Sequence, residues 1–103
     1  MKHRTHDQAM AALFQQEPAF ALDLLNSVLA DGDQAELQVV LRQLVKAVGG
    51  VQVIADKAHL GSSRVYRSIA ADADPALSNF RHILDAMGMR LTVAPKVHYS
   101  AHG

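Results

Sequence analysis

The chain has 103 residues, and its ten Lys and Arg residues balance ten Asp and Glu residues, so the formal net charge is zero with His neutral. Half of the residues are hydrophobic and Cys is absent, which argues against wholesale disorder and excludes disulfides and thiolate metal sites. No apolar run approaches the roughly 18 residues of a membrane span, and the N-terminus lacks the apolar core of a signal peptide. We therefore expect one cytoplasmic domain over residues 1–103, without membrane contact.

The charges are unevenly distributed along the chain. Residues 1–36 hold two basic and six acidic residues, residues 37–67 hold five basic residues and one acidic residue, and residues 68–103 hold three of each. Such asymmetry can mark a basic face beside an acidic one. Ordinary solvated helix faces would give the same counts, and charge alone favours that interpretation.

Helical signals dominate the first third of the chain. Thr5 followed by Gln8 fits a capping box and predicts that a helix begins there. Pro18 suits the first turn of a second helix, and Gly32 suits its end. The sequence therefore predicts N-terminal helices over residues 6–32.

Three more helices are predicted in the centre of the chain. Asp33 suits the cap of a helix whose apolar residues recur every three or four positions until Gly49 and Gly50. Two short helices follow, separated by a break at residues 59–61. Together with the next helix, they form the predicted core over residues 33–88.

The last part of the chain contains one further predicted helix. Asp74 suits its cap, Pro75 its first position and Gly88 its end. Residues 90–93 alternate polar and apolar side chains and Pro95 follows, which predicts a short strand within residues 89–95. We expect residues 96–103 to form a flexible tail. A lone strand needs a partner, and we expect it from a homodimer or from a strand of another protein.

The two short helices and their break have the pattern of a helix-turn-helix unit. Ala55 is expected where the two helices approach most closely, and His59 is expected at a backbone position with positive φ. The apolar residues expected at the crossing are Ile54, Ala58, Leu60 and Val65. Spacing alone leaves this unit and an ordinary corner between two helices equally open.

The exposed face of the second short helix carries the candidate DNA-binding residues. Ser and Arg side chains can contact base edges, whereas Lys supplies phosphate contacts. We expect Tyr66 to pack at the helix crossing, Ser68 to lie at the margin of the exposed face, and Arg42 to be a further phosphate contact. The residues predicted near base edges are Ser62, Ser63, Arg64 and Arg67, and those predicted near phosphates are Lys46 and Lys57.

Two stretches of the sequence resemble known proteins. Residues 53–57 (Val-Ile-Ala-Asp-Lys) followed by residues 60–62 (Leu-Gly-Ser) resemble the helix-turn-helix of the lambda-repressor/Cro type. Over about residues 7–94, a longer pattern is similar to the addiction-module antidote proteins, which are HigA-like antitoxins of type II toxin–antitoxin systems. That pattern runs Leu41-Arg42, Ala47-x-Gly49-Gly50, Ile54-Ala55, Leu60, Val65-Tyr66-Arg67, Asp74-Pro75-x-Leu77, Ile83-Leu84-x-Ala86-x-Gly88-x-Arg90-Leu91-x-Val93.

The resemblance implies an all-α, lambda-repressor-like bundle with an N-terminal helical extension, to which the sequence adds the short C-terminal strand. It also implies a transcriptional regulator that binds double-stranded DNA at its own promoter and neutralises a RelE-like, mRNA-cleaving toxin. One departure is that residues 59–62 replace the family's usual Gly-Leu-Ser-Arg, so an Arg is missing there and Arg64 is expected to take over its contact. In an alternative interpretation, the acidic helices of residues 6–30 bind a basic toxin and DNA binding is weak.

Enzymatic and metal-binding interpretations have little support. Ser62 and Ser63 lack a recognisable base arrangement or nucleophile elbow. The pairs His3 with His6 and His98 with His102 have helical ligand spacing but no adjoining carboxylates, so we expect them to be incidental. No catalytic residue, metal site or cofactor is therefore expected.

Overall fold

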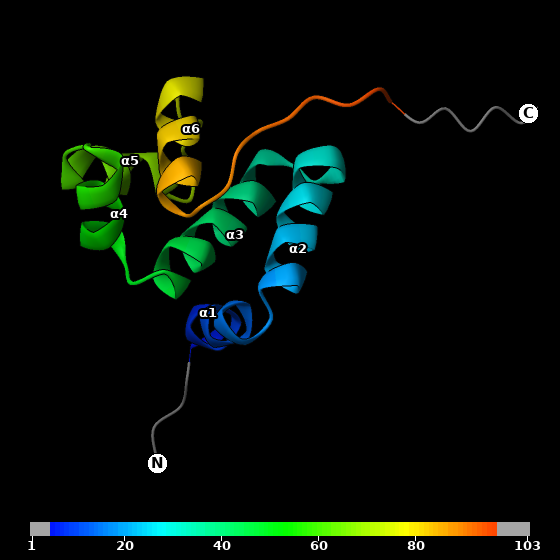
Figure 1. The fold of residues 1–103 in the computed structure, drawn as a ribbon, viewed down its shortest axis with the longest axis horizontal. Helices are drawn as coiled ribbons and strands as arrows, with labels where there is room; N and C mark the ends of the chain where they lie inside the picture. The colour runs from blue at the N-terminus through cyan, green and yellow to red at the C-terminus, as the bar shows by residue number, and fades with distance from the viewer. Residues whose placement is uncertain (1–4, 97–103) are drawn as a thin grey trace, which may run out of the picture.

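The computed structural model describes residues 5–96, which form six α-helices and no strand. The all-α prediction is confirmed for these residues (Figure 1). The tail predicted at residues 96–103 lies outside the described residues except for Lys96, and His3, His98 and His102 also lie outside them. The helices are α1 (His6–Gln16), α2 (Pro18–Asp31), α3 (Gln34–Ala47), α4 (Val51–Ala58), α5 (Ser62–Ile69) and α6 (Leu77–Ala86).

Helix α3 lies in the middle and separates two groups of helices (Figure 1). Among the described helices, α1 and α2 contact only each other and α3, whereas α4, α5 and α6 contact one another. Helices α4 and α5 therefore lie at the end of the molecule opposite α2 (Figure 1).

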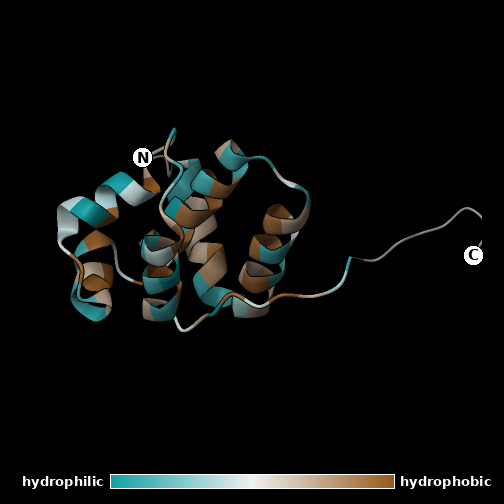
Figure 2. Cartoon of the chain, turned by 90° about the horizontal axis from the view of Figure 1, so that it is seen from above, coloured by the Kyte–Doolittle hydropathy of each residue, from teal (hydrophilic) through white to brown (hydrophobic). Residues whose placement is uncertain are grey.

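One hydrophobic core joins the helices across α3. Leu41 and Val45 of α3 belong to it together with Ile54 of α4, Val65 of α5 and Ile83 of α6, and none of these side chains is more than 2% exposed. Figure 2 shows the hydrophobic residues gathered between the helices. The three- and four-residue spacing of the apolar side chains explains this arrangement, because it places them on one stripe of each helix.

Two of the three predicted side-chain caps are present, those of α1 and α3. The hydroxyl of Thr5 accepts a hydrogen bond from the Gln8 amide N–H, and the Gln8 side chain accepts one from the Thr5 N–H, both at 3.0 Å. The carboxylate of Asp33 accepts from the Glu36 N–H at 2.8 Å. Each cap satisfies a backbone donor that the first turn of its helix leaves unpaired.

Helices α3, α4 and α6 end in the same way. Shortly after each helix the chain has a residue with positive φ, namely Gly49 (122°), His59 (56°) or Gly88 (80°), and after α3 the next residue, Gly50 (101°), has positive φ as well. The amide of the next residue then donates to a carbonyl five positions earlier, as from Gly50 to Val45 and from Met89 to Leu84, both at 2.9 Å. This pairing defines the Schellman motif and turns the chain sharply after each helix.

The structure corrects two predictions near the C-terminus. Residues 89–95 form no strand, because no other segment among residues 5–96 lies beside them as a strand. Helix α6 begins at Leu77 with Ala76 at the cap, not at Pro75 with Asp74 at the cap, because Ala76 is still extended (ψ 143°).

No single helix among residues 5–96 is long and apolar enough to cross a membrane. The pair α3–α4, which is bent by 87°, meets the length and composition criteria only when the two helices are taken together.

Candidate nucleic-acid interface

The turn between α4 and α5 brings these two short helices together. His59 adopts the left-handed conformation (φ 56°, ψ 38°), and the Leu60 amide donates to the Ala55 carbonyl at 3.1 Å. The predicted positive φ at His59 is confirmed. His is one of the residues enriched among non-glycine residues with positive φ.

The contact between α4 and α5 is apolar and closely packed. Ile54 and Val65 are fully buried, and Ala55 and Ala58 are 3% and 7% exposed. Leu60 is partly buried and packs against the same core. The five residues expected at the crossing therefore all contribute to it, and they fix α5 against α4.

Helix α5 presents a polar face to solvent. Ser63, Arg64 and Arg67 are exposed and Ser62 is partly exposed, so all four predicted base-edge residues are accessible. Two expectations are wrong. Tyr66 is 62% exposed rather than packed at the crossing, and Ser68 is 4% exposed, with its hydroxyl donating to the Arg64 carbonyl at 2.8 Å.

The C-terminal end of α5 is held by a buried side chain of α3 that the sequence analysis missed. The Gln38 amide group donates to the carbonyls of Ser68 at 2.8 Å and Ala70 at 2.9 Å. Its own oxygen accepts from Gln34 at 3.0 Å, and the side chain is completely buried. Gln38 lies three and seven positions before Leu41 and Val45, inside the apolar stripe of α3, and a buried polar group at such a position is the signal that could have revealed it.

The basic residues of α3 and α4 differ in their exposure and in their contacts with carboxylates. Lys46 and Lys57 are exposed in the last turns of α3 and α4. The guanidinium of Arg42 instead donates to the Asp7 carboxylate at 2.9 Å. A phosphate contact from Arg42 would therefore compete with Asp7.

The pKa of Asp7 is lowered by its neighbours. The Gln43 side chain donates to the second carboxylate oxygen at 3.1 Å, and this hydrogen bond and that from Arg42 are the leading causes. The charges of Arg42 and Lys46 lower the pKa further. Asp7 therefore joins α1 to α3 as a carboxylate.

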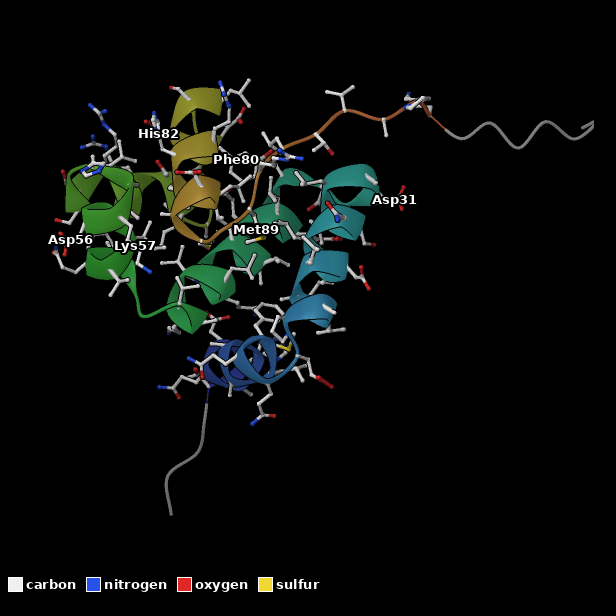
Figure 3. All side chains as sticks on the ribbon, in the orientation of Figure 1. Asp31, Asp56, Lys57, Phe80, His82 and Met89 are labelled. Atoms are coloured by element: carbon white, nitrogen blue, oxygen red, sulfur yellow. The ribbon has the colours of Figure 1, made fainter. Side chains whose placement is uncertain are left out.

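A hollow of about 410 Å³ places one of the lysines beside α5. Lys46 of α3 and Tyr66 of α5 line it together with Gly50 and Val51 at the start of α4. Lys57 does not line this hollow. In Figure 3, Lys57 and Asp56 lie on α4, at the end of the molecule opposite Asp31 of α2. Lys46 thus lies beside Tyr66 of α5, whereas none of the four predicted base-edge residues lines this hollow.

The chemistry of the exposed residues of α5 and of Lys46 suits a polyanion. The exposed face of α5 carries hydroxyl groups and two guanidinium groups, and Lys46 of α3 adds an ammonium group beside Tyr66. Within residues 5–96, no three His, Asp or Glu side chains are grouped so that they could hold a metal ion. Phosphates and base edges of DNA are ligands for which these donors are commonly used.

Comparison with protein families gives one match. The model of a family described as "probable addiction module antidote protein" matches residues 5–95, which extend from the α1 cap into the segment after α6. The chain belongs to this family. Neither the curated proteins nor the solved structures give a match.

Membership of the addiction module antidote family confirms the resemblance to that family over about residues 7–94. It gives the chain the role of an antitoxin in an addiction module, and therefore a toxin as its partner. The match includes α1 and α2, so the antidote protein's N-terminal helices belong to the family pattern as much as α4 and α5 do.

Proposed function

We propose that this antidote protein is a HigA-like antitoxin of a type II module and a sequence-specific DNA-binding regulator that represses its own operon. It acts without catalysis, by occupying its promoter in the cytoplasm as a homodimer. The observation that carries this proposal is the α4–turn–α5 unit, in which His59 makes the turn and α5 exposes Ser63, Arg64 and Arg67.

The dimensions of this unit support the proposal. Helix α5 has eight residues and is therefore roughly 12 Å long, which suits entry into a major groove about 12 Å wide. In a lambda-repressor-like helix-turn-helix, α4 would cross the DNA backbone and the N-terminal part of α5 would face the bases. Gln38 of α3 would keep α5 in place during this contact.

The candidate residues would make different contacts with DNA, according to their chemistry. Arg64 and Arg67 have the donor geometry to read guanine, and Ser62 and Ser63 can contact bases or phosphates. Lys46 and Lys57 would contribute phosphate contacts, which supply affinity but no direct sequence information.

A gel shift on the promoter of the protein's own operon, at two salt concentrations, tests this proposal. Arg67→Ala should weaken binding by about 1–3 kcal/mol, and Lys57→Gln should lower the slope of log affinity against log salt by about one. Arg81→Ala on α6 is the matched control, because Arg81 lines a different hollow beside Arg90 and Leu91. Wild-type protein with no preference for its promoter over a scrambled sequence would refute the proposal.

The second candidate is a toxin-neutralising module with little DNA binding. Helix α2 favours it, because α2 carries Asp23 and Asp31 but no Lys or Arg, and exposes Phe20, Leu22 and Leu29 by 39–45%. An RNA-cleaving toxin needs a cationic surface for its substrate, so an acidic helix with apolar side chains complements it.

Leu29→Asp tests this candidate by co-purification of the toxin, with circular dichroism to confirm folding. The toxin-neutralising function would be favoured if Leu29→Asp no longer co-purifies the toxin and the wild type does not shift promoter DNA in the gel assay. Undiminished capture of the toxin by Leu29→Asp would argue against α2 as the binding surface.

A further inference from the structure

The hollow between α3, α4 and α5 has an apolar lining. Val45 of α3 and Ile69 of α5 are buried, Val51 of α4 and Ala70 are partly buried, and all four line it. Its volume of about 410 Å³ lies within the range of small-molecule sites, which extends from about 300 to 1,000 Å³. A phosphate group of DNA gains nothing from apolar surface, so this lining favours a ligand that has an apolar body.

Tyr66 adds an aromatic ring to the same hollow. The side chain lines it and is 62% exposed, although its neighbour Val65 is fully buried. Within residues 5–96 the paired aromatic rings are Phe14 and Phe20, so Tyr66 has no ring against it. An aromatic ligand in the hollow could stack on this ring, as aromatic side chains do on one another.

Two cationic side chains of α3 also line the hollow. Arg42 and Lys46 are one helical turn apart and therefore lie on the same face of α3. The Nε of Arg42 donates to Asp7, whereas its terminal nitrogens donate to no residue within the described chain. Lys46 is exposed, and no carboxylate within residues 5–96 forms an ion pair with it. Both side chains therefore keep donors for a ligand.

The charges around the hollow complement one negative charge. Asp7 is the carboxylate beside the two cations, because it accepts from Arg42 at 2.9 Å and the charges of Arg42 and Lys46 both lower its pKa. Among residues 5–96, no Asp or Glu lines the hollow itself. Two cations and one carboxylate leave a single positive charge, which favours a monoanion over a cation.

We propose that this hollow binds a small aromatic monoanion, with its acid group between Arg42 and Lys46 and its ring against Tyr66. The planar guanidinium of Arg42 matches a carboxylate, and the ammonium group of Lys46 adds a point charge. The apolar lining removes the ring of the ligand from water. Aromatic carboxylates are the chemical class that this combination recognises.

A bound anion of this kind would weaken DNA binding by competition. Lys46 is a proposed phosphate contact and Tyr66 precedes Arg67 on α5, so the ligand would bring negative charge close to the DNA backbone. This consequence rests on the proposed function, whereas binding of the anion is measured without DNA. Failure of the site and failure of DNA binding can therefore be distinguished.

The fluorescence of anilinonaphthalene sulfonate tests the site, because this probe has an aromatic body and one negative charge. Phenylnaphthylamine has the same rings without the sulfonate and is the matched uncharged probe. We expect Lys46→Gln to weaken binding of the sulfonate to the folded chain by about three- to fivefold, and to leave binding of phenylnaphthylamine unchanged. Asp7→Asn should strengthen sulfonate binding, because it releases the guanidinium of Arg42.

Two further variants locate the bound probe. Ala70→Leu fills the hollow without removing a charge, so both probes should lose most of their binding. The backbone carbonyl of Ala70 remains in place as the acceptor for Gln38. Arg81→Gln is the control, because Arg81 lines a different hollow on α6, and it should leave the binding of both probes unchanged. Circular dichroism confirms that each variant is folded.

Three results would overturn the proposal. One is a wild type that binds no sulfonate, or whose binding Ala70→Leu leaves unchanged. Another is an equal loss of both probes in Lys46→Gln, because the site would then not recognise the charge. The third is loss of binding in Leu22→Ser, which would place the probe in the separate hollow beside α2. In the promoter gel shift, the sulfonate should lower the affinity of the wild type, and an unchanged affinity would refute the competition.

Discussion

Two buried glutamines show how single residues of α3 position its neighbours. Gln38 is completely buried and Gln43 is 2% exposed, and both have hydrogen-bond partners from other helices or loops. Gln38 holds the end of α5, whereas Gln43 holds Asp7 in the first turn of α1. A buried amide group without such partners would cost about 1–3 kcal/mol, so these pairings specify where α1 and α5 lie.

Asp7 makes the stability of the protein depend on pH. Its pKa is lowered in the folded state, first by the hydrogen bond from Gln43 and then by Arg42. A carboxyl with a lowered pKa contributes stability above its unfolded pKa and loses that contribution as the pH falls through the folded pKa. We expect the free energy of unfolding to fall more steeply below about pH 4 in the wild type than in Asp7→Asn.

Urea unfolding at a series of pH values between neutral and strongly acidic measures this difference. Asp23→Asn is the control, because Asp23 is exposed on α2 and makes no side-chain hydrogen bond within the described residues. Equal slopes for Asp7→Asn and the wild type would show that the Asp7 contacts contribute no net stability.

At the scale of the helices, defined hydrogen-bonded motifs mark several of the helix ends. Three helices end in a Schellman motif, and α1 and α3 begin with side-chain caps. The other four helices have no side-chain cap, and in α5 the cap Gly61 has no side chain that could accept a hydrogen bond. The helix proposed to read DNA therefore begins with unpaired backbone donors that can face a phosphate.

Gly61→Ser should stabilise the protein by roughly 0.5–1 kcal/mol, because it adds a cap and reduces the freedom of the unfolded chain. Gly61 has φ −66° and ψ 144°, and a Cβ at this position meets no atom within 4 Å, so the serine fits. Gly61→Asp should stabilise similarly but weaken DNA binding, since its carboxylate would repel phosphates. Thermal unfolding and the promoter gel shift measure the two effects, and a loss of stability in Gly61→Ser would contradict the predicted cap.

The whole molecule has two chemically different ends. Acidic α2 lies at one end and the α4–α5 unit at the other, with α3 between them (Figure 1). A toxin bound at α2 would therefore leave α5 accessible. Because the formal net charge is zero, attraction to DNA in general should be weak, and base contacts and dimerisation become more important.

The acidic loop between α5 and α6 should further weaken the electrostatic attraction of the protein to DNA. Asp72 and Asp74 are exposed there, close in sequence to the end of α5. We expect the double change Asp72→Asn with Asp74→Asn to raise affinity for promoter and scrambled DNA by the same factor at low salt, and to have little effect at high salt. The same assay with Asp23→Asn should show no change, and a gain restricted to promoter DNA would contradict this electrostatic explanation.

Much of the fold could be predicted from the sequence because its signals are local. Thr5 and Gln8 are three residues apart and cap one turn, and the conformation of His59 follows from the ending of its own helix. The apolar spacing of α3 likewise predicts its buried stripe without knowledge of its neighbours. Such interactions depend only on residues within a few positions, so the sequence by itself determined the helices, most of their ends and the family.

The tertiary structure decided what each exposed or buried polar group contacts. Arg42 pairs with Asp7 and Gln38 binds the end of α5, across separations of 30 residues or more. Tyr66 is exposed and Ser68 buried because α3 packs against one side of α5. The predicted strand failed for the same physical reason, since a strand requires a partner, and none is present beside residues 89–95 within the described chain.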